Sequence, residues 1–540
     1  MVDHLISKRP EDLSVRGPYG IPLHAALWNG HGSVALLLLS QCVDVDIRGI
    51  EDRTPLHMAV DHGLLEVTQT LLERGANINA RDSSDQTPLY PTFRGRSGTF
   101  DDTYFDVVRY LLDHGADVDT QASAEHSTPL HLASYWGGFK VARLLLDRGV
   151  NINVRDGRCL TPLHKTLILM DNSISDYFVD TVRFLLDHGA DVDAEDNNYS
   201  TPLHVISKYG NVKAVRLLLE HGARVDALDN NHLTPLHFSS RHVNVETSQL
   251  LLDHGAEVHA LDENHSTPLH FASEGGKAEA VCLLLGHGAD VHAQNNSHST
   301  PLHFISPYDD DGAARALLEH GAVVDARDNK DTTPLHVASQ CGNVEVARLL
   351  LEHDANIHVR NKEDQTPQHL LLANWGGESL EDDIDTIRFF LDRGADVDAV
   401  DDEDHSTLLH VASYHGCIKV AQLLLEHGAN TNVRNGQRQT PLHRALVRIK
   451  DEFGDRFFNG IRLLLEHGAD VDALDDENST PLHVASQRGS VKATRLLLEH
   501  GANVDLQNNE GHTPSQVALA KGHEKIARVL SEHSQSEQKM

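Results

Sequence analysis

The sequence predicts an all-α solenoid of about fifteen stacked helix-turn-helix repeats with short hairpin-like turns. Three observations support this fold class. A tetrapeptide close to TPLH recurs along almost the whole chain. Its spacing is 33 residues ten times and 40 or 41 residues four times, and each copy is followed by two apolar segments separated by a glycine or a short break. The copies begin at residues 21, 54, 87, 128, 161, 201, 234, 267, 300, 333, 366, 407, 440, 480 and 513.

The unit that begins at Thr201 explains why each repeat should form two helices. Thr201 is a good helix N-cap, and Pro202 occupies the first helical position, where its missing N–H does no harm. Gly210 ends this first helix. The apolar run 212–219 predicts a second helix, with Gly222 placed where a left-handed residue is needed. The Asp- and Asn-rich segment that follows predicts a turn leading to the next threonine.

The period, the tetrapeptide and the helix breaks together resemble the ankyrin repeat, a turn plus two antiparallel helices with a T-P-L-H-x-A core motif. The resemblance covers residues 21–533 and implies that the motif histidine hydrogen-bonds within its own repeat and to the neighbouring repeat. Tyr90 and Gln516 replace the histidine in the third and last repeats, so those two joints are expected to differ. The histidines expected to have this role are His57, His131, His204, His237, His270, His303, His336, His410, His443 and His483.

The two ends predict capping. Residues 1–20 align with the back half of a repeat and are expected to form a partial N-terminal repeat or cap, whereas residues 534–540 are expected to be disordered. The segment RPEDLSVRGPYGIPLHAALWNGHGSV resembles the start of the ankyrin arrays of fungal NACHT-ankyrin receptors. That resemblance implies an alternative in which the chain is the ligand-recognition arm of a larger NACHT-type signalling receptor.

Four repeats, those starting at 87, 161, 366 and 440, have about seven extra residues between their helices. The pattern recurs with an offset of 279 residues, which indicates that a block near 87–233 was duplicated as 366–512. Either recombination with tolerated loop growth produced this pattern, or the array has two equivalent docking surfaces. The aromatic residues of these repeats either pack a lengthened helix or form a partner site; they include Phe93, Phe100, Tyr104, Tyr177, Phe178, Trp375, Phe453 and Phe457.

Charge and cysteine usage limit the function classes. The net charge of −34, from 46 basic and 80 acidic residues, disfavours nucleic acid and anionic membranes and weakly favours a partner with a basic surface. No apolar run is long enough to insert into a membrane, and no signal-peptide core is present. The five cysteines are scattered and never spaced CxxC. We therefore expect a cytoplasmic protein, with the nucleus as the other compartment.

The expected partner-binding positions are the seventh and eighth residues after each motif threonine, because ankyrin arrays usually bind through the concave groove and the turn tips. Aromatic and arginine side chains anchor interfaces. The alternative is that the aromatic side chains only cover the seam between repeats. The candidates at these positions are Trp28, Tyr135, Trp136, Tyr209, Arg241, Tyr308, Tyr414 and Arg488.

The turns are acidic, with Asp-Val-Asp at four places. Their aspartates either stabilise the turns and keep the chain soluble or form an edge for a basic segment, whose binding would slow as salt rises. Protonating all 39 histidines would change the formal charge from −34 to +5, so acid should weaken such binding. The aspartates of these Asp-Val-Asp segments are Asp117, Asp119, Asp191, Asp193, Asp396, Asp398, Asp470 and Asp472.

Catalytic and metal-binding motifs are absent from the sequence. There is no HExxH, GxxxxGK[ST] or GxSxG, and the repeats occupy almost the whole chain. His232, His265 and His298 recur at one turn position, but the spacing between repeats is too wide for one ion to be shared. We therefore expect no enzyme, no cofactor and no metal. The sequence predicts a protein-binding scaffold or adaptor.

Overall fold

The chain is described by a computed structural model that covers residues 21–41, 43–90, 102–121, 125–170, 176–305, 311–373, 380–400, 404–449 and 454–537. Its contacts divide it into an N-terminal unit, Met1–Glu263 with Gly286–Gly288, and a C-terminal unit, Asn264–Leu285 with Ala289–Met540. Throughout the described residues the regular structure is helical and contains no β-strand, which confirms the all-α expectation. None of the described helices is both long and apolar enough to span a lipid bilayer.

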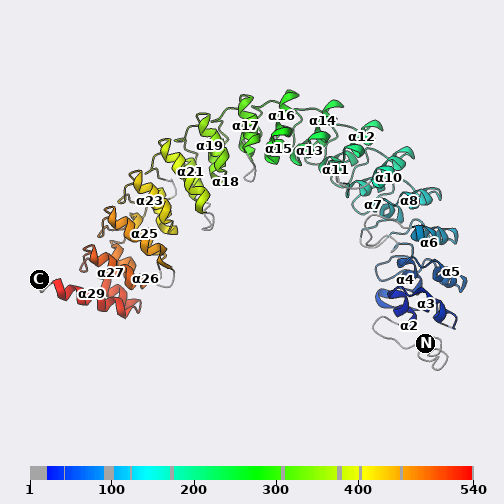
Figure 1. The fold of residues 1–540 in the computed structure, drawn as a ribbon, viewed down its shortest axis with the longest axis horizontal. Helices are drawn as coiled ribbons and strands as arrows, with labels where there is room; N and C mark the ends of the chain where they lie inside the picture. The colour runs from blue at the N-terminus through cyan, green and yellow to red at the C-terminus, as the bar shows by residue number, and fades with distance from the viewer. Residues whose placement is uncertain are drawn as a thin grey trace. The chain divides into compact units, whose positions relative to one another are not determined.

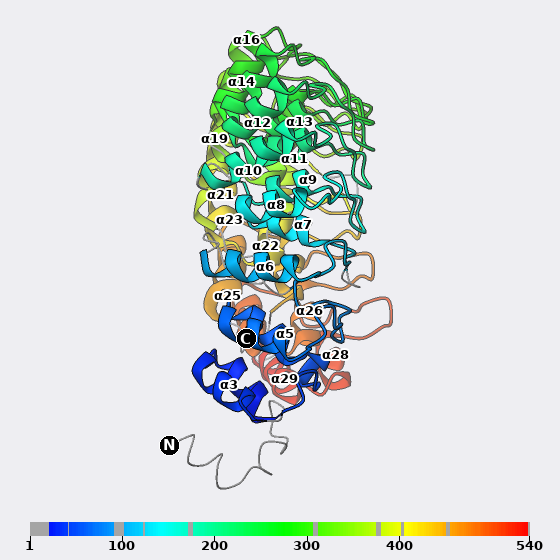
Figure 2. The same ribbon diagram turned by 90° about the vertical axis from the view of Figure 1, so that its right-hand side faces the viewer.

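Within the N-terminal unit the first helices of successive repeats pack side by side in one row and the second helices in another (Figure 1). The hairpin loops that connect the repeats project on one side of the helices (Figure 2). The elements of this unit are α2 (Pro22–Trp28), α3 (Gly32–Leu39), η2 (Ile50–Asp52), α4 (Pro55–Asp61), α5 (Leu65–Glu73), α6 (Asp102–Asp113), α7 (Pro129–Tyr135), α8 (Phe139–Leu146), α9 (Pro162–Leu167), α10 (Asp176–Asp187), α11 (Pro202–Tyr209), α12 (Val212–Glu220), α13 (Pro235–Arg241) and α14 (Val245–Asp253).

The C-terminal unit repeats the same arrangement, with first helices packed on first helices and second helices on second helices. Its elements are α15 (Pro268–Gly275), α16 (Ala278–Gly286), η4 (Pro301–Phe304), α17 (Gly312–Glu319), α18 (Pro334–Cys341), α19 (Val344–Glu352), α20 (Pro367–Ala373), α21 (Leu380–Asp392), α22 (Leu408–His415), α23 (Ile418–Glu426), α24 (Pro441–Val447), α25 (Gly454–Glu466), α26 (Pro481–Arg488), α27 (Val491–Glu499), α28 (Pro514–Ala520) and α29 (Glu524–Glu537).

The helix pair α11–α12 forms for the reasons that the sequence gives. Thr201 caps α11 and Pro202 starts it, and Gly210 ends it in the left-handed region with φ of 83°. The side chain of Asn211 then caps α12 by accepting the N–H of Ala214 at 3.1 Å. The buried face of α12, which includes Leu218, packs against α10 and α14. Each repeat thus covers the apolar face of its neighbours.

The hairpin loops are joined by a ladder of backbone hydrogen bonds, one rung per pair of repeats. In the N-terminal unit the N–H of Asn230 donates to the carbonyl of Asn198 at 2.9 Å, and the N–H of Asn197 donates to that of Arg158 at 3.1 Å. In the C-terminal unit the N–H of Asn329 donates to the carbonyl of Ser297 at 2.8 Å. These rungs hold successive loops at a fixed register beside the first helices.

The four long repeats use part of their extra residues to lengthen the second helix. Helices α6, α10, α21 and α25 have 12 or 13 residues, against 9 in α12. The buried rings of Tyr104, Phe178 and Phe457 pack against the glycines that follow the first helix of the preceding repeat, which are Gly63, Gly137 and Gly416. These three aromatic residues therefore pack a lengthened helix. Phe93, Phe100, Trp375 and Phe453 lie outside the described residues.

Three local expectations need correction. The repeat at 87 has a turn after Thr87 rather than the start of a helix, and its Tyr90 is buried where other repeats have histidine. The first helix at Thr300 is reduced to the four-residue η4, and Ile305 directly after it has an extended backbone. Helix α29 extends to Glu537, so residues 534–537, which we expected to be disordered, are helical.

Candidate functional site

A buried threonine–histidine pair locks most repeats to the next. In the repeat at 128, the backbone N–H of Thr128 donates to Nδ1 of His131 at 3.1 Å, and the Thr128 hydroxyl lies 2.9 Å from the same nitrogen. Nε2 of His131 lies 2.9 Å from the carbonyl of Leu160, which precedes the next motif threonine. A carbonyl accepts only, so Nε2 must hold the proton and Nδ1 must be bare. The geometry therefore fixes a neutral tautomer.

This pair recurs along the array and confirms the role that the resemblance implied. His237 makes the local contacts with Thr234 at 3.0 and 2.9 Å. The last repeat substitutes Gln516, whose Oε1 accepts the N–H of Thr513 at 2.9 Å. The other predicted histidines that make both the local contacts and the contact to the next repeat are His57, His204, His270, His303, His336, His410, His443 and His483.

Burial keeps these imidazoles neutral. It lowers the pKa of His131, His270 and His410 to about 4, although the backbone hydrogen bond of each ring acts in the opposite direction. The pKa values of seven further motif histidines are also lowered by burial. Mild acid should therefore not bring the formal charge to the +5 of full histidine protonation, because the motif histidines with lowered pKa values stay neutral there.

A groove of about 450 Å³ lies in the N-terminal unit between the first helices and the hairpin loops. Residues of α11 and α13, together with Ile168 directly after α9, provide most of its apolar side. The loops before α9 and α11 provide polar side chains and backbone. Its lining is Arg158, Leu160, Ile168, Asp196, Asn197, Asn198, Ser200, His204, Val205, Lys208, Tyr209 and Phe238. The groove can therefore hold apolar and polar groups of one extended ligand at the same time.

Tyr209 is the predicted residue that lines this groove, and the ammonium of Lys208 lies 5.7 Å from the centre of its ring. Tyr135 and Trp136 make an edge-to-face pair at the end of α7, with ring centres 5.0 Å apart. Both rings are half-buried. Trp28 is 44% exposed at the end of α2. The candidates of this unit thus lie at equivalent helix ends, but they do not converge on one site.

The remaining candidates are similarly distributed. Arg241 is exposed at the end of α13, and Arg488 is exposed at the end of α26. Tyr414 is half-buried in the C-terminal unit beneath the guanidinium groups of Arg444 and Arg448. Tyr308 lies outside the described residues.

Two apolar lining residues on the first helices were not among the predicted partner-binding residues. Val205 and Phe238 are the fourth residues after their motif threonines and lie in the groove beside Tyr209. The fourth and eighth residues are one helical turn apart and therefore share a face. That spacing is the signal that could have found them. Arg158 was also missed, because its approach to the first helices depends on how the loop folds.

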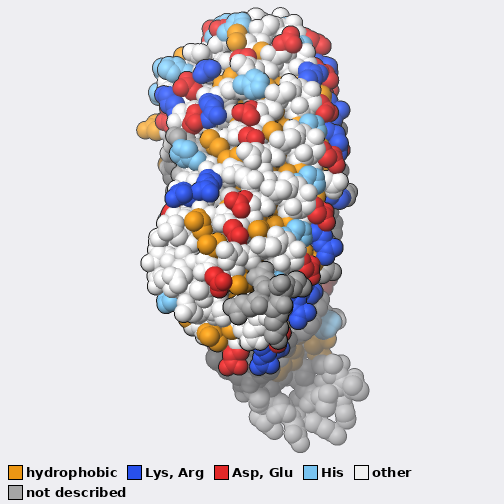
Figure 3. All heavy atoms as spheres, turned by 90° about the vertical axis from the view of Figure 1, so that its left-hand side faces the viewer, with side chains coloured by type: hydrophobic (Ala, Val, Ile, Leu, Met, Phe, Trp, Pro, Cys, Tyr) orange, Lys and Arg blue, Asp and Glu red, His pale blue; other side chains and the backbone are white. Residues whose placement is uncertain are grey.

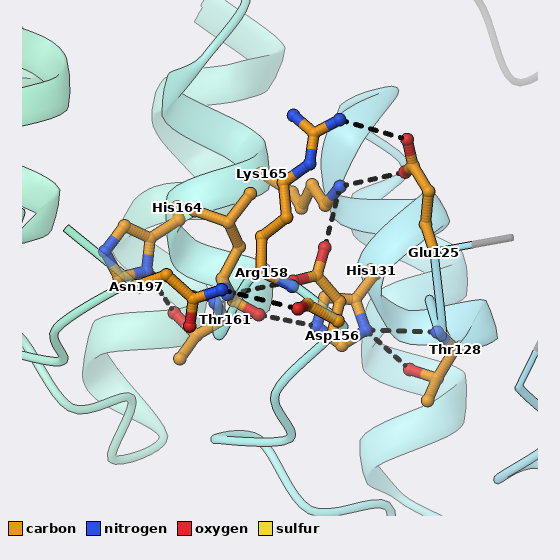
Figure 4. A network of polar contacts seen from close by, with 11 residues as sticks. Glu125, Thr128, His131, Asp156, Arg158, Thr161, His164, Lys165 and Asn197 are labelled. Carbon is orange, nitrogen blue, oxygen red and sulfur yellow. Dashed lines mark hydrogen bonds and ion pairs between the residues drawn. The ribbon is translucent and has the colours of Figure 1, made fainter.

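An ion-pair network lies beside this groove (Figure 4). Nζ of Lys165, on α9, lies 2.9 Å from a carboxylate oxygen of Asp156 and 3.5 Å from one of Glu125, which also faces Arg158 at 3.7 Å. The side chain of Asp156 is fully buried, and its other oxygen accepts the N–H groups of Arg158 and Leu160. Burial alone would raise the pKa of Asp156, but Lys165 and these N–H groups hold it below its usual value.

The acidic turns are occupied by contacts within the array. Oδ1 of Asp191 accepts the N–H of Asp193 at 3.1 Å, and Oδ1 of Asp193 accepts the N–H of Arg224 in the next repeat at 2.9 Å. Asp472 accepts the N–H of Asn503 in the same way at 2.9 Å. On the face shown in Figure 3, acidic side chains lie among basic ones rather than in one continuous patch. These contacts favour the turn-stabilising interpretation of the aspartates.

The turn histidines have a conformational explanation. His232, His265 and His298 have φ values of 59°, 59° and 57°, a left-handed conformation in which histidine, asparagine and aspartate are enriched. Among the residues that the structure describes, no group of three or more His, Cys, Asp or Glu side chains is arranged to hold a metal ion.

Regular helix pairs, a backbone ladder through the hairpin loops and a repeated Thr–His lock define a helical repeat protein. Models of the ankyrin-repeat family match most of the chain. The model described as "Ankyrin repeats (3 copies)" matches residues 1–82, 169–262, 225–295, 269–361, 377–475 and 452–539, and the model described as "Ankyrin repeats (many copies)" matches residues 111–165. The chain therefore belongs to the ankyrin-repeat family.

Similar curated proteins match over short segments. Ankyrin repeat and SOCS box protein 16 of Mus musculus is 44% identical over 64 residues, which are 12% of this chain and 14% of that protein. The E3 ubiquitin-protein ligase KEG of Arabidopsis thaliana is 37% identical over 68 residues, 13% of this chain and 4% of that protein. The putative ankyrin repeat protein FPV031 of fowlpox virus is 36% identical over 73 residues, 13% of this chain and 21% of that protein. The matches thus span between 4% and 21% of the length of these relatives.

Proposed function

We propose that the chain is a non-enzymatic scaffold that binds a partner protein in the groove beside α9, α11 and α13. Ankyrin repeats generally mediate protein–protein interaction. The observation that carries the proposal is the groove itself, in which Tyr209, Val205 and Phe238 lie beside the polar side chains of Arg158 and Asn197. Aromatic and apolar anchors ringed by polar groups are the composition of a protein-binding site.

The occupant that fits best is an extended segment of the partner. The apolar side of the groove follows three successive first helices, which lie in contact with their neighbours. A peptide lying along this row would bury its apolar side chains against Val205 and Phe238 and direct its polar groups toward the loop residues Asn197 and Asn198. The groove residues would act together, because one anchoring side chain contributes most where its neighbours exclude water.

Affinity purification with the intact chain, from cells that express it, tests this proposal. The variant with both Tyr209→Ala and Phe238→Ala should lose the partner that the unaltered chain retains. The control is Tyr110→Ala on the second helix α6, where the half-buried ring stacks on His114 with centres 3.9 Å apart. A partner retained by the groove variant, or lost equally with Tyr110→Ala, would refute the proposal.

The finer proposal of a partner with a basic surface rests on the net charge of −34. Its association rate should fall as salt rises, because long-range attraction is screened over about 8–10 Å at ordinary ionic strength. A rate that does not change with salt would remove this part of the proposal. We also propose a cytoplasmic or nuclear location, which fluorescence of a tagged chain in its own cells would test.

The second candidate function is that of the ligand-recognition arm of a larger signalling receptor of the NACHT type. The resemblance of the segment at residues 9–34 to the start of such arrays motivates it. Transcripts that continue upstream of Met1 into an NTP-binding domain would support this candidate. Transcripts that place a stop codon directly upstream of Met1 would refute it.

A further inference from the structure

The duplicated block of the C-terminal unit has a different surface from its counterpart in the N-terminal unit. The eighth residues after three successive motif threonines are Trp136, Leu169 and Tyr209 in the N-terminal unit. At an offset of 279 residues the same positions hold His415, Arg448 and Arg488. An apolar and aromatic row has thus become a basic one. The two surfaces cannot be equivalent docking sites, which was one of the two interpretations of the duplication.

One of these basic groups, Arg448, shares an aromatic ring with a further arginine, Arg444. The guanidinium carbon of Arg444 lies 4.4 Å from the centre of the Tyr414 ring, and that of Arg448 lies 5.0 Å from it. Nε of Arg444 is buried and makes no hydrogen bond within the described residues. No carboxylate in the described part of the chain pairs with either arginine. Stacking therefore orients both guanidinium groups without neutralising them.

The N-terminal counterpart of Arg444 is neutralised. Lys165 occupies that position and pairs with Asp156 at 2.9 Å and with Glu125 at 3.5 Å. The position of Asp156 holds Asn435 in the C-terminal unit, whose Oδ1 accepts the N–H groups of Gln437 and Gln439. The amide keeps the turn but removes one of the two carboxylates, since the position of Glu125 holds Asp404. The same framework thus holds a cation paired with two carboxylates in one unit, and in the other it holds two arginines that pair with no carboxylate of the described residues.

We propose that the face formed by Tyr414, His415, Arg444, Arg448 and Arg488 binds an acidic peptide segment of a partner protein. This inference rests on the proposed scaffold function and names the chemistry of a second site. Two cations held on one ring repel each other, and a carboxylate between them removes that repulsion. A guanidinium group presents paired N–H donors that match the two oxygens of a carboxylate. Stacking on the Tyr414 ring holds the guanidinium groups in place before the ligand binds.

The position of the face suits an extended ligand. Tyr414 and His415 end α22, Arg444 and Arg448 lie in and directly after α24, and Arg488 ends α26. These three first helices contact one another in sequence. A row of acidic side chains along a peptide could therefore meet successive basic groups. In a chain with a net charge of −34, such a local cation cluster also directs an acidic segment to this face rather than to its neighbours.

Fluorescence anisotropy with the full chain tests the proposal. The probe is a labelled peptide of Asp, Glu and Gly, compared with the same peptide in which Asn and Gln replace the acids and with a phosphoserine version in which the acids are amides. The chain should bind the acidic peptide and not the amide peptide. The double variant Arg444→Gln with Arg448→Gln should weaken binding about tenfold or more, since charge-assisted hydrogen bonds are lost.

The matched control changes charge by the same amount elsewhere. It is Arg462→Gln with Arg495→Gln, both exposed on the second helices α25 and α27, and it should bind as the unaltered chain does. If circular dichroism shows that the variant Arg444→Gln with Arg448→Gln does not fold, Arg448→Leu replaces it. That variant restores at an exposed position the residue found at Leu169, and it should also weaken binding.

Four outcomes would overturn the proposal: no binding of the acidic peptide, equal binding of the amide peptide, equal weakening by the control pair, or binding of the phosphoserine peptide alone. The scaffold proposal is judged separately, because it depends on the Tyr209 and Phe238 variant in the N-terminal unit. If the acidic peptide fails while that variant still loses its partner, only the inference about the basic face falls.

Discussion

Lowering the pH from about 7 to about 5 should destabilise the array through its buried histidines. An unfolded imidazole has a pKa of 6.5, whereas burial lowers that of folded His131 to about 4. Between these two values the unfolded state binds more protons, so the free energy of unfolding falls as the pH falls. The loss begins below about pH 6.5 and is complete below about pH 4.

The magnitude follows from these two pKa values. At about pH 5 the imidazole of His131 should contribute a loss of about 2 kcal/mol. His270 and His410, with the same lowered pKa of about 4, should each contribute a loss of similar size to the C-terminal unit. Losses of this size are a large part of the stability of an ordinary domain.

Urea unfolding at the two pH values measures the effect. Trp136 follows α7 and reports on the repeat of His131, so the other tryptophans, Trp28 and Trp375, are changed to Phe. The matched variant is His131→Gln, because the chain itself uses Gln516 to cap a helix without a titrating group. Moderate salt limits the contribution of the acidic surface charge.

The variant should be less stable than the parent at pH 7, since its glutamine loses the contact of His131 with the carbonyl of Leu160. Between the two pH values, the free energy of unfolding of the variant should fall by about 2 kcal/mol less than that of the parent. If parent and variant lose equal stability on acidification, the neutral buried imidazole is not the cause and this account of the lock is wrong.

Three further predictions concern stability in urea. Leu218→Ala in α12, where the side chain is fully buried, should reduce the free energy of unfolding by about 2–5 kcal/mol, and a loss below about 1 kcal/mol would contradict the packing described. Gly210→Ala should lower the free energy of unfolding by more than about 1 kcal/mol, because φ is 83° and the new methyl group would meet the side chain of Asn244. An unchanged urea midpoint would disprove this close approach. Lys165→Met should lower the free energy of unfolding by about 3 kcal/mol, because it leaves the buried Asp156 without its ammonium partner. Adding Asp156→Asn should recover most of that loss. A double variant as unstable as the single one would disprove the pairing.

The regular part of the fold could be predicted because each of its determinants is local. Thr201, Pro202 and Gly210 specify one helix through capping and backbone conformation, whatever surrounds them. The fixed period then places the same determinants at the same positions of each following repeat. Departures were harder to predict. The helix after Thr300 has only four residues, although the repeat keeps its length of 33 residues, so the period alone does not reveal the change.

The candidate site was predicted only in part, because it depends on contacts between repeats. Tyr209 could be found from its position on a helix, whereas Arg158 reaches the groove through the fold of a loop. The charge of Lys165 is visible in the sequence, but its neutralisation by Asp156 and Glu125 requires three segments to meet. For the same reason, the sequence alone could not show that Lys165 and Arg444 have different charged neighbours.

Photo-crosslinking tests the central claim, that this array binds a partner protein along its first helices, most directly. A photoreactive amino acid is placed at Val205, in the groove, and in a second chain at Lys213, which is exposed on the second helix α12. The account predicts that the partner is captured from Val205 and not from Lys213. Capture from Lys213 at equal yield, or from Lys213 alone, would contradict it.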